Sequence, residues 1–518
     1  MRYPIGVQTF EEMINGEYVY VDKTDLVYTL AHGHICFLSR PRRFGKSLLI
    51  STLDAYFSGK KELFKGLKID ELEKEWSEYP VFRIDFAVGD YTKANELETI
   101  LDDILEKWER KYGVSCRTNS LGKRFHNILE VAEIKTKSKA VVLVDEYDKP
   151  MLDVLGTELE EKNRNILKGF YGAFKSADAH LRFVFLTGVT KFSQVSVFSG
   201  FNQPDDISMD EQFDAICGIT EKELKYYFAQ SIEEMSAKLK CSSEELKEKL
   251  KKNYDGYHFS EAMLDIYNPF SILNAFKKKK IEDYWYESGT PTYLEKLMEG
   301  HQINMQKLIG RSYARKYFMD YRADKEEPLA MLYQSGYLTI KEYDIRHRVY
   351  KLDYPNDEVR KGFVSLVGNS YFRKPSEDND NWILEMDNML RECDLDGVRD
   401  AFTSFLASIP YEANKDERAK DFETHFSYTF YIINRLLGCY TTLIEKQNSK
   451  GRADMIIETD NDIFIFEFKL DGSAKEALDQ IEQQQYAVPY LDDKRPVHKI
   501  GVNISSESRT VDEWLVSE

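Results

Sequence analysis

Cysteine is scarce in this sequence and never occurs in the spacings that build zinc modules or disulfide frameworks. The 518 residues include six cysteines, with no Cys-x-x-Cys pair and no nearby pair of histidines. Zinc sites and disulfide frameworks usually depend on such pairs, so neither zinc nor a disulfide framework is expected. The cysteine pattern favours a reducing compartment, and we expect a cytoplasmic protein.

Long apolar runs are missing as well. The most apolar long stretch, residues 426–444, is interrupted by Asn434, Arg435 and Gly438, which indicates buried elements instead of a membrane span. The first residues combine an arginine, a proline, a glycine and two glutamates, unlike a secretory signal peptide. No membrane association is expected.

Positive charge is in deficit. Lysine and arginine total 71 against 89 acidic residues, which gives a formal net charge of -18. A surface devoted to nucleic acid needs clustered basic residues, so that class is disfavoured, while a local nucleic-acid site stays open. With 42% hydrophobic and 31% charged residues, the composition is that of a soluble protein, and the length predicts about three domains.

The sequence does contain a loop suited to binding phosphate. An apolar run at residues 35–38 is followed by SRPRRFGKS at residues 39–47 and then by a helical pattern. This order directs backbone N–H groups and a helix N-terminus at one point, where an ammonium and a hydroxyl complete a nucleotide-triphosphate site. The expected nucleotide-binding residues are Arg43, Phe44, Gly45, Lys46 and Ser47. Ser47 is also an expected Mg²⁺ ligand, and Arg40 stands where the standard pattern has its first glycine.

A second signal for the nucleotide site lies about a hundred residues further on, as a doubly wound domain requires. A continuous apolar run at residues 140–144 ends in Asp145 and Glu146. Such a run predicts a central parallel strand, and α/β proteins bind their ligands at the C-terminal ends of these strands. We expect Asp145 to bind the nucleotide and its Mg²⁺, and Glu146 to be the catalytic base. Thr187, at the end of another apolar run, either contacts the nucleotide as a phosphate sensor or simply ends a strand.

Several motifs resemble those of the bacterial AAA-ATPase-like family. They are YPIG at 3–6, YVDKT at 20–24, RPRRFGKS at 40–47, VDEYDKP at 144–150, LTGVTKFS at 186–193 and YDGY at 254–257. The resemblance covers most of the chain. In that family arginine replaces the first glycine of the loop as a rule, and members commonly carry a C-terminal domain of the PD-(D/E)XK nuclease superfamily.

The expected fold class is α/β, in three parts. Residues 1–218 are predicted to form a P-loop ATPase core with a doubly wound parallel sheet. Residues 219–375 are predicted to form a helical lid with a winged-helix-like part, in which a helix, a turn at Gly336 and a strand precede a hairpin partner at 349–352. Residues 376–518 are predicted to form a PD-(D/E)XK nuclease-like α/β domain. The strands expected in the core lie at residues 35–38, 81–86, 140–144 and 182–187.

A second set of chemical groups lies near the C-terminus. In IFIFEFK at residues 463–469, the period of two places three phenylalanines on one face and Glu467 with Lys469 on the other. A turn-rich segment at 459–462 leads back to the preceding strand, so Asp454 is expected to approach Glu467 across the hairpin. Asp454 and Glu467 are then predicted metal ligands and catalytic residues, and Lys469 a catalytic residue that stabilises developing charge.

The order of elements around these residues resembles the PD-(D/E)XK nuclease fold. A helix is followed by Glu445, by Gly-Arg-x-Asp at 451–454, by Glu-x-Lys, and by a helix that carries Gln480. Glu445 and Gln480 are expected accessory residues. A capping-box pattern at residues 473–476 predicts the start of the last helix. A salt-bridged strand edge also uses Glu-x-Lys, so whether the site cuts stays open.

The predicted function is that of an ATP-binding protein, an Mg²⁺-dependent ATPase whose nucleotide state governs a metal-dependent, nuclease-like domain acting on DNA or RNA. The expected cofactors are ATP and Mg²⁺, with Mn²⁺ as a second candidate at the C-terminal site. The alternative is an ATP-dependent regulatory switch whose C-terminal domain does not cleave and binds a protein or nucleic-acid partner. A third reading is a nucleic-acid-binding adaptor without chemistry at either site.

Overall fold

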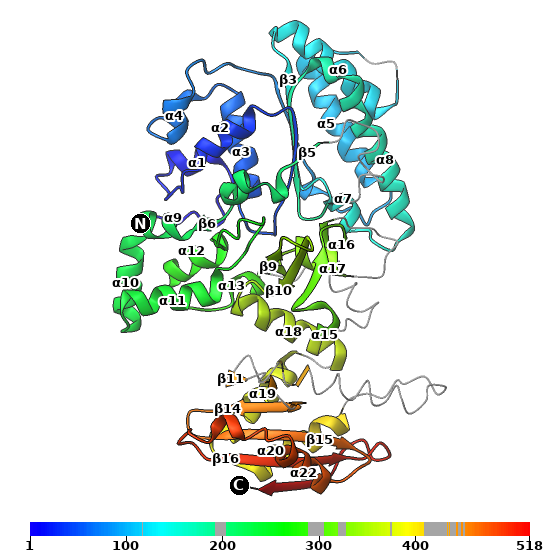
Figure 1. Ribbon diagram of the computed structural model, residues 1–518. Helices are drawn as coiled ribbons and strands as arrows, with labels where there is room; N and C mark the ends of the chain where they lie inside the picture. The colour runs from blue at the N-terminus through cyan, green and yellow to red at the C-terminus, as the bar shows by residue number, and fades with distance from the viewer. Residues whose placement is uncertain are drawn as a thin grey trace. The chain divides into compact units, whose positions relative to one another are not determined.

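The computed structural model contains two compact units (Figure 1). One unit holds Met1–His301 and Met305–Val359, and the other holds Gln302–Asn304 and Arg360–Glu518. The domain boundaries at 218/219 and 375/376 remain predictions. The structure describes residues 1–115, 118–191, 204–288, 305–319, 328–372, 376–408, 432–433, 435, 442–443, 447–448 and 451–517.

A five-stranded parallel sheet forms the centre of the first unit, with the strand order β2-β3-β4-β1-β5. The strands are β1 (Ile35–Ser39), β2 (Val81–Asp85), β3 (Ala140–Asp145), β4 (Leu181–Gly188) and β5 (Asp205–Asp206). All four strands expected from the sequence are confirmed. Because β4 pairs Thr187 with Leu38 of β1 and Leu186 with Val144 of β3, the C-terminal ends of these three strands meet at one edge.

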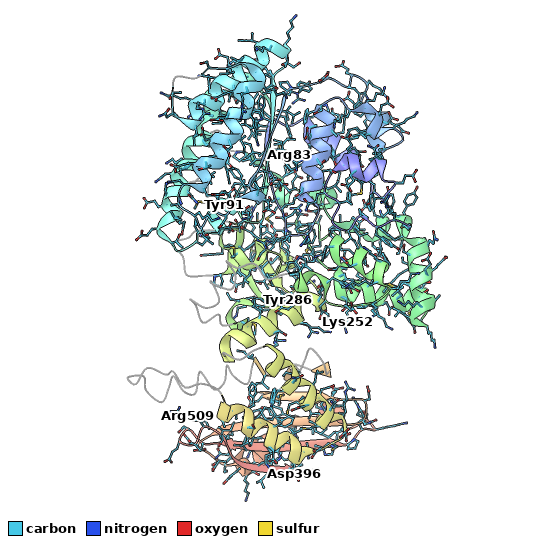
Figure 2. The ribbon with its side chains drawn as sticks, turned by 180° about the vertical axis from the view of Figure 1, so that it is seen from behind. Arg83, Tyr91, Lys252, Tyr286, Asp396 and Arg509 are labelled. Carbon is cyan, nitrogen blue, oxygen red and sulfur yellow. The ribbon has the colours of Figure 1, made fainter. Side chains whose placement is uncertain are left out.

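Helices cover both faces of this sheet, with α1 to α3 on one side and α5, α6 and α8 on the other (Figure 1). The helices are α1 (Phe10–Asn15), α2 (Thr24–Ala31), α3 (Lys46–Phe57), α4 (Lys68–Leu72), α5 (Glu96–Tyr112), α6 (Leu121–Thr136), α7 (Lys149–Leu152) and α8 (Glu158–Ser176). Every residue of β3 is buried, as expected of a strand covered on both faces. Side chains fill the space between the layers (Figure 2): Tyr91 is 1% exposed and its hydroxyl donates to the Phe86 carbonyl at 3.1 Å.

The rest of the first unit combines helices with a small antiparallel sheet of order β8-β10-β9. Its elements are β6 (Ile219–Thr220), α9 (Glu221–Tyr227), α10 (Ala229–Leu239), α11 (Ser243–Tyr254), β7 (Ile266–Tyr267), α12 (Pro269–Lys278), α13 (Tyr284–Glu287), α15 (Met305–Leu308), β8 (Arg311–Ala314), α16 (Lys316–Met319), α17 (Leu329–Gln334), β9 (Thr339–Asp344) and β10 (Val349–Asp353). The expected hairpin is confirmed, because Val349 pairs with Asp344. The turn at Gly336 joins α17 to this hairpin, which gives the winged-helix-like arrangement.

A five-stranded mixed sheet forms the centre of the second unit, with the order β11-β14-β15-β16-β17. Its elements are α18 (Asp357–Phe372), which begins in the first unit, α19 (Ser376–Arg391), α20 (Leu395–Ser408), β11 (Thr442–Leu443), β12 (Gln447–Asn448), β13 (Gly451–Arg452), β14 (Met455–Glu458), β15 (Ile463–Leu470), α22 (Ala474–Gln483), β16 (Val497–Ile504) and β17 (Val511–Ser517). β15 and β16 are parallel, and the other neighbours are antiparallel. Among the residues that the structure describes, no helix combines the length and the apolarity needed to cross a membrane.

The two faces of β15 are those that the period of two predicts. On one face Ile463 and Ile465 pack with Ile481 of α22 in a buried cluster. On the other, the Phe468 ring lies 6.3 Å from the ring of Phe402 on α20. The expected capping box is present at the start of α22. Glu467 and Lys469 share the face of Ile463 and Ile465, so they lie on the side of β15 that α22 covers.

The turn at Gly336 generates a stability prediction. Its φ is +91°, and a Cβ there would lie 2.7 Å from Cβ of Pro41 in the phosphate loop. We expect Gly336→Ala to lower the free energy of unfolding of the first unit by about 1–3 kcal/mol in denaturant titrations. The matched control is Gly172→Ala in α8, where a Cβ meets nothing within 4 Å, and which should stabilise by about 0.5–1 kcal/mol. Equal effects of the two substitutions would contradict the prediction.

Candidate functional site

The loop between β1 and α3 lies at the C-terminal edge of the parallel sheet. Gly45 has a φ of +97°, a value that residues with a Cβ rarely adopt, and α3 begins directly after it at Lys46. Ser47 is the second residue of α3, and its hydroxyl lowers the pKa of the Asp145 carboxyl against the effect of burial. A hydroxyl and a carboxylate therefore meet beside the loop, and this hard oxygen donor set fits Mg²⁺.

Lys46 is directed at its own loop. Its Nζ donates to the carbonyl oxygens of Arg40 and Pro41, both at 3.0 Å, and the residue is 7% exposed. Burial lowers the pKa of Lys46, while the carboxylates of Glu146 and Asp145 oppose that shift. Phosphate oxygens carry charge, so they bind such an ammonium more strongly than neutral carbonyls do.

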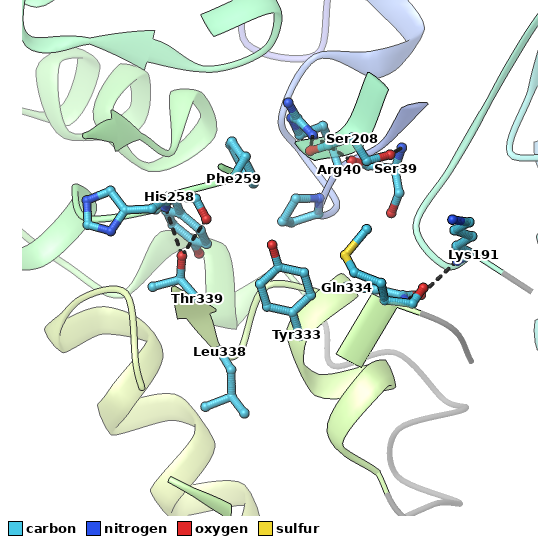
Figure 3. Close-up of a pocket in the computed structure, with 13 residues that line it drawn as sticks. Ser39, Arg40, Lys191, Ser208, His258, Phe259, Tyr333, Gln334, Leu338 and Thr339 are labelled. Carbon is cyan, nitrogen blue, oxygen red and sulfur yellow. Dashed lines mark hydrogen bonds between the residues drawn. The ribbon is translucent and has the colours of Figure 1, made fainter. Parts of the chain in front are cut away.

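Arg40 occupies the position of the missing glycine and anchors the loop through its side chain (Figure 3). The guanidinium is 1% exposed and donates to the carbonyl oxygens of Ser39 at 2.9 Å, Ser208 at 2.8 Å and Phe213 at 3.2 Å. Its Cζ lies 4.0 Å from the centroid of the Phe259 ring. These contacts fix the start of the loop, so the departure from the standard glycine pattern has a structural explanation.

A cavity of about 20 Å³ lies beside this anchor (Figure 3). Its walls include Arg40 from the loop and Tyr333 and Gln334 from α17. This volume holds about one water molecule, so the cavity is no nucleotide pocket. Oε1 of Gln334 accepts a hydrogen bond from the Lys191 amide at 2.7 Å. The loop and the winged-helix-like part are thus packed together at this seam.

Phe44 and Arg43 contact the middle of the first unit. The Phe44 side chain is 1% exposed, and its ring lies 4.8 Å from the Tyr257 ring in an edge-to-face arrangement. Arg43 has a φ of +66°, and its Cζ lies 4.9 Å from the Phe270 ring. The buried Phe44 ring is therefore part of the core, and the nucleotide-binding role of Phe44 stays a prediction.

Carboxylates gather where β2 and β3 end. Asp145 is 2% exposed, and burial raises its pKa; the charges of Asp85 and Glu146 raise it further, while Ser47 and Lys46 oppose the shift. Asp85 is the register partner of Asp145 on β2. A divalent cation removes such repulsion between carboxylates. Glu146 has a φ of +48°, and strained backbone of this kind is often found at functional sites.

Two further polar residues near this edge are bonded within the fold. The Thr187 hydroxyl is fully buried and donates to the Leu38 carbonyl at 2.9 Å, which joins β4 to β1. Oδ2 of Asp148 accepts from the amides of Val189 at 3.0 Å and Thr190 at 2.6 Å. Asp148 therefore holds the turn after β4, and the phosphate-sensing role of Thr187 stays a prediction.

Four of the residues predicted for the C-terminal site form one connected group. The Phe468 amide donates to Oδ2 of Asp454 at 2.9 Å, and the Asp454 amide donates to Oε2 of Glu467 at 3.4 Å. Nζ of Lys469 lies 4.0 Å from Oε1 of Glu467 and donates to Gln480. The Gln480 amide donates in turn to Glu467. The hairpin register and α22 thus bring the predicted residues together.

The electrostatics of this group suit a cation. Glu467 is 2% exposed, and burial raises its pKa to about 7, with the charge of Asp454 as the next cause. Two neighbouring carboxylates repel each other when no cation is bound. A divalent ion bound between them lowers both pKa values. The residues therefore fit a metal with oxygen ligands. Glu445, the fifth predicted residue, lies outside the described residues.

Comparisons with known proteins place these observations in a family. A family model described as a predicted AAA-ATPase matches residues 4–198, and a PD-(D/E)XK nuclease superfamily model matches residues 421–514. A relative from Azotobacter chroococcum mcd 1, named "Uncharacterized protein in vnfD 5'region", is 34% identical over 526 residues, which cover 99% of this chain and 98% of the relative. The chain belongs to the AAA-ATPase-like family. It carries a PD-(D/E)XK nuclease-like domain near its C-terminus.

The two domains suggest an ATPase combined with a nuclease-like function, and such domains generally use a nucleotide and a divalent metal. In this AAA-ATPase-like chain, sequence reasoning missed Asp85 as a member of these sites and did not give the contacts of Tyr486 and Arg40. Asp85 ends an apolar strand, a signal it shares with Asp145. Tyr486 is 4% exposed, and burial raises its pKa while Gln480 opposes that shift. The buried anchoring by Arg40 has no local sequence signal.

The raised pKa of Glu467 generates a prediction for metal binding. Below pH 7 this group holds a proton that Mn²⁺ must displace, so we expect affinity to weaken by up to about tenfold per pH unit below 7 and to level off above it. Isothermal titration calorimetry of the full chain without nucleotide, in two buffers of different ionisation enthalpy, should show nearly one proton released at pH 6 and nearly none at pH 8.

The raised pKa of Glu467 also determines whether the metal-free protein gains or loses stability as the pH rises. Between the ordinary glutamate pKa and about 7, the folded state holds the Glu467 proton and the unfolded state does not, so this group's contribution to stability falls as pH rises through that window. Glu467→Gln is the matched control and should remove this group's contribution to the pH dependence of both measurements. A pH-independent Mn²⁺ affinity in the wild type would contradict the assignment.

Proposed function

We propose that this AAA-ATPase-like protein hydrolyses ATP with Mg²⁺ and that its nucleotide state governs metal-dependent cleavage of nucleic acid by the C-terminal domain. The proposal rests on two groups of residues in the same chain. One is the Ser47–Asp145 pair beside the phosphate loop, and the other is the connected group of Asp454, Glu467, Lys469 and Gln480. Each group supports one half of the proposal.

For the ATPase half, Lys46 and the loop amides bind the phosphates, while Ser47 and Asp145 hold the metal. When Mg²⁺ is bound, it would neutralise part of the negative charge of the phosphates. Glu146 is the proposed base, because it follows the metal-binding carboxylate at the strand end and its main chain is held in an unusual conformation. Asp148 is a poorer base, since its Oδ2 already accepts hydrogen bonds from the turn after β4.

For the nuclease half, Asp454 and Glu467 would hold the metal, which would supply polarisation of the scissile phosphate and of the attacking water. Gln480 bonds both Lys469 and Glu467, so it orients the lysine toward the carboxylate that binds the metal. Lys469 then stabilises the charge that develops on the phosphate. The substrate is DNA or RNA.

The second candidate function is an ATP-dependent switch whose C-terminal domain binds a partner without cleaving it. The net charge of -18 favours this candidate, because a nuclease has to attract a polyanion. ATP turnover without cleavage of any labelled DNA or RNA, with Mg²⁺ or Mn²⁺, would support the switch.

The ATPase half predicts separate effects on binding and turnover. Glu146→Gln keeps the side-chain shape and removes its proton-accepting carboxylate, so we expect ATP to bind as in the wild type while turnover falls about a hundredfold or more. Lys46→Ala removes the buried cation and should abolish most ATP binding. Binding is measured with a fluorescent ATP analogue and turnover by phosphate release. Unchanged turnover in Glu146→Gln would show that Glu146 is not the catalytic base. Unchanged ATP affinity in a folded Lys46→Ala variant would show that the loop does not bind ATP.

The nuclease half predicts opposite stability effects for a metal site and for a structural ion pair. With Asp454 as a metal ligand, Asp454→Asn relieves its repulsion with Glu467, so the metal-free protein should melt at the same or a slightly higher temperature. In the wild type, Mn²⁺ at about a hundred times its dissociation constant should add about 2.7 kcal/mol of stability. That thermal shift, and cleavage of labelled DNA or RNA with or without ATP, should be absent in the variant.

A structural ion pair predicts the reverse. Asp454→Asn would then lower the melting temperature whether or not metal is present, and the wild type would not respond to Mn²⁺ or Mg²⁺. Lys469→Gln is the matched control, because it removes a charge from the same group without removing a metal ligand. It should keep the Mn²⁺ shift and lose cleavage.

A further inference from the structure

Three side chains of metal-binding type meet in the second unit, away from the nuclease-like group. Cys393 lies between α19 and α20, Asp462 directly precedes β15, and His498 is the second residue of β16. Sγ of Cys393 lies 3.5 Å from Nε2 of His498, and Oδ1 of Asp462 lies 2.8 Å from the same nitrogen. The three ligand atoms all lie within 4.8 Å of one another. Asp462 and His498 are 9% and 7% exposed, and Cys393 is half-buried.

The fold positions each of the three residues separately. The His498 ring stacks on Phe464 with centroids 5.1 Å apart. The Asp462 amide donates to the Thr459 hydroxyl at 3.0 Å, and the Asp462 carbonyl accepts from the Thr459 amide at 2.9 Å. Cys393 ends the turn after α19, where its amide donates to the Leu390 carbonyl at 3.3 Å. The cluster is therefore assembled from three well-packed segments.

This cluster lies on the opposite face of the sheet from Glu467. Phe464 pairs with His498 in the parallel register of β15 and β16, and Asp462 shares the face of Phe464 by the period of two. Glu467 has the other parity and lies five residues further along the chain than Asp462, which is about 16 Å in a strand. A ligand at the cluster is therefore separate from one at the nuclease-like group.

The geometry does not suit a nucleophilic triad. In such a triad the nucleophile and the carboxylate contact different nitrogens of the imidazole, so that the ring can accept a proton on one side while it is oriented from the other. Here Sγ and Oδ1 approach the same nitrogen, Nε2. Convergence of three donor atoms on one point is the arrangement of ligands around an ion.

We propose that Cys393, Asp462 and His498 bind a zinc ion that ties the α19–α20 connection to the starts of β15 and β16. Zn–S and Zn–N bonds of about 2.3 and 2.0 Å at a tetrahedral angle separate sulfur from nitrogen by about 3.5 Å. The separation of Sγ and Nε2 is 3.5 Å. Oδ1 needs to withdraw from Nε2 by about half an ångström to reach its tetrahedral place.

The donor set also selects the metal. A thiolate with an imidazole and a carboxylate favours Zn²⁺ over Mg²⁺, which takes oxygen ligands alone. Three protein ligands leave one position for water. The ion holds the ends of two neighbouring strands, one of which carries Glu467 and Lys469, so it stabilises the sheet on which the nuclease-like group is built.

The test uses Co²⁺ as a spectroscopic substitute for zinc. The full chain is stripped with a chelator and titrated with Co²⁺, and we expect a thiolate-to-metal charge-transfer band that saturates at one ion per chain. Zn²⁺ should abolish the band and raise the melting temperature. Oxygen ligands alone give no such band, so Co²⁺ at Asp454 and Glu467 does not contribute, and Asp454→Asn should keep the band at full intensity.

Variants locate the ion. Cys393→Ser and His498→Gln should remove the band, and Cys393→Ser should weaken Zn²⁺ binding about a hundredfold or more. Cys241→Ser, a half-buried cysteine in the first unit, is the matched control and should leave both unchanged. Absence of the band from the wild type, or its persistence in Cys393→Ser, would overturn the proposal. If a variant fails to fold, the wild-type titration still shows whether the protein binds a metal ion through a thiolate.

Discussion

The first unit depends on one buried cation, the guanidinium of Arg40. A buried charge without partners costs several kcal/mol, so its contacts have to be made whenever the unit is folded. The guanidinium bonds three carbonyl oxygens, one in β1 and two in the segment at 208–213, and it lies against the Phe259 ring. Lys46 in turn bonds the Arg40 and Pro41 carbonyls. The position of the Lys46 ammonium therefore follows from the position of Arg40.

The same loop is joined to distant parts of the first unit. The Phe44 ring packs on Tyr257, and Nε1 of Trp285 donates to the Arg42 carbonyl at 3.1 Å. Densely packed contacts of this kind do not deform gradually, because a small shift in one ring displaces its neighbours. A phosphate that draws Lys46 away from the loop carbonyls would alter the loop from which these contacts come. The aromatic residues of the YDGY region are thus packed directly against the loop.

Both candidate sites keep carboxylates buried beside other carboxylates. Asp145 lies beside Asp85 and Glu146, and the pKa of Glu467 is raised by burial and by Asp454. Carboxylates buried next to one another repel, and a bound cation would stabilise such an arrangement. The charge beside each site therefore differs from the net charge of the chain. Local cations, Lys46 in one site and Lys469 in the other, face the phosphates in the proposed function.

The sequence by itself determined the elements and pairs that depend on short stretches of chain. The strand, loop and helix around Gly45, the carboxylates that end β3, and the approach of Asp454 to Glu467 all follow from apolar runs and the period of two, because a strand end or a hairpin places its residues by backbone geometry alone. Only the tertiary structure decided the partners of Arg40, one of them 168 residues away, the pairing of Asp85 with Asp145, and the meeting of Cys393 with Asp462 and His498. Those contacts join segments that are brought together by burial of the whole core. A local sequence pattern does not determine which distant segment will pack next to it.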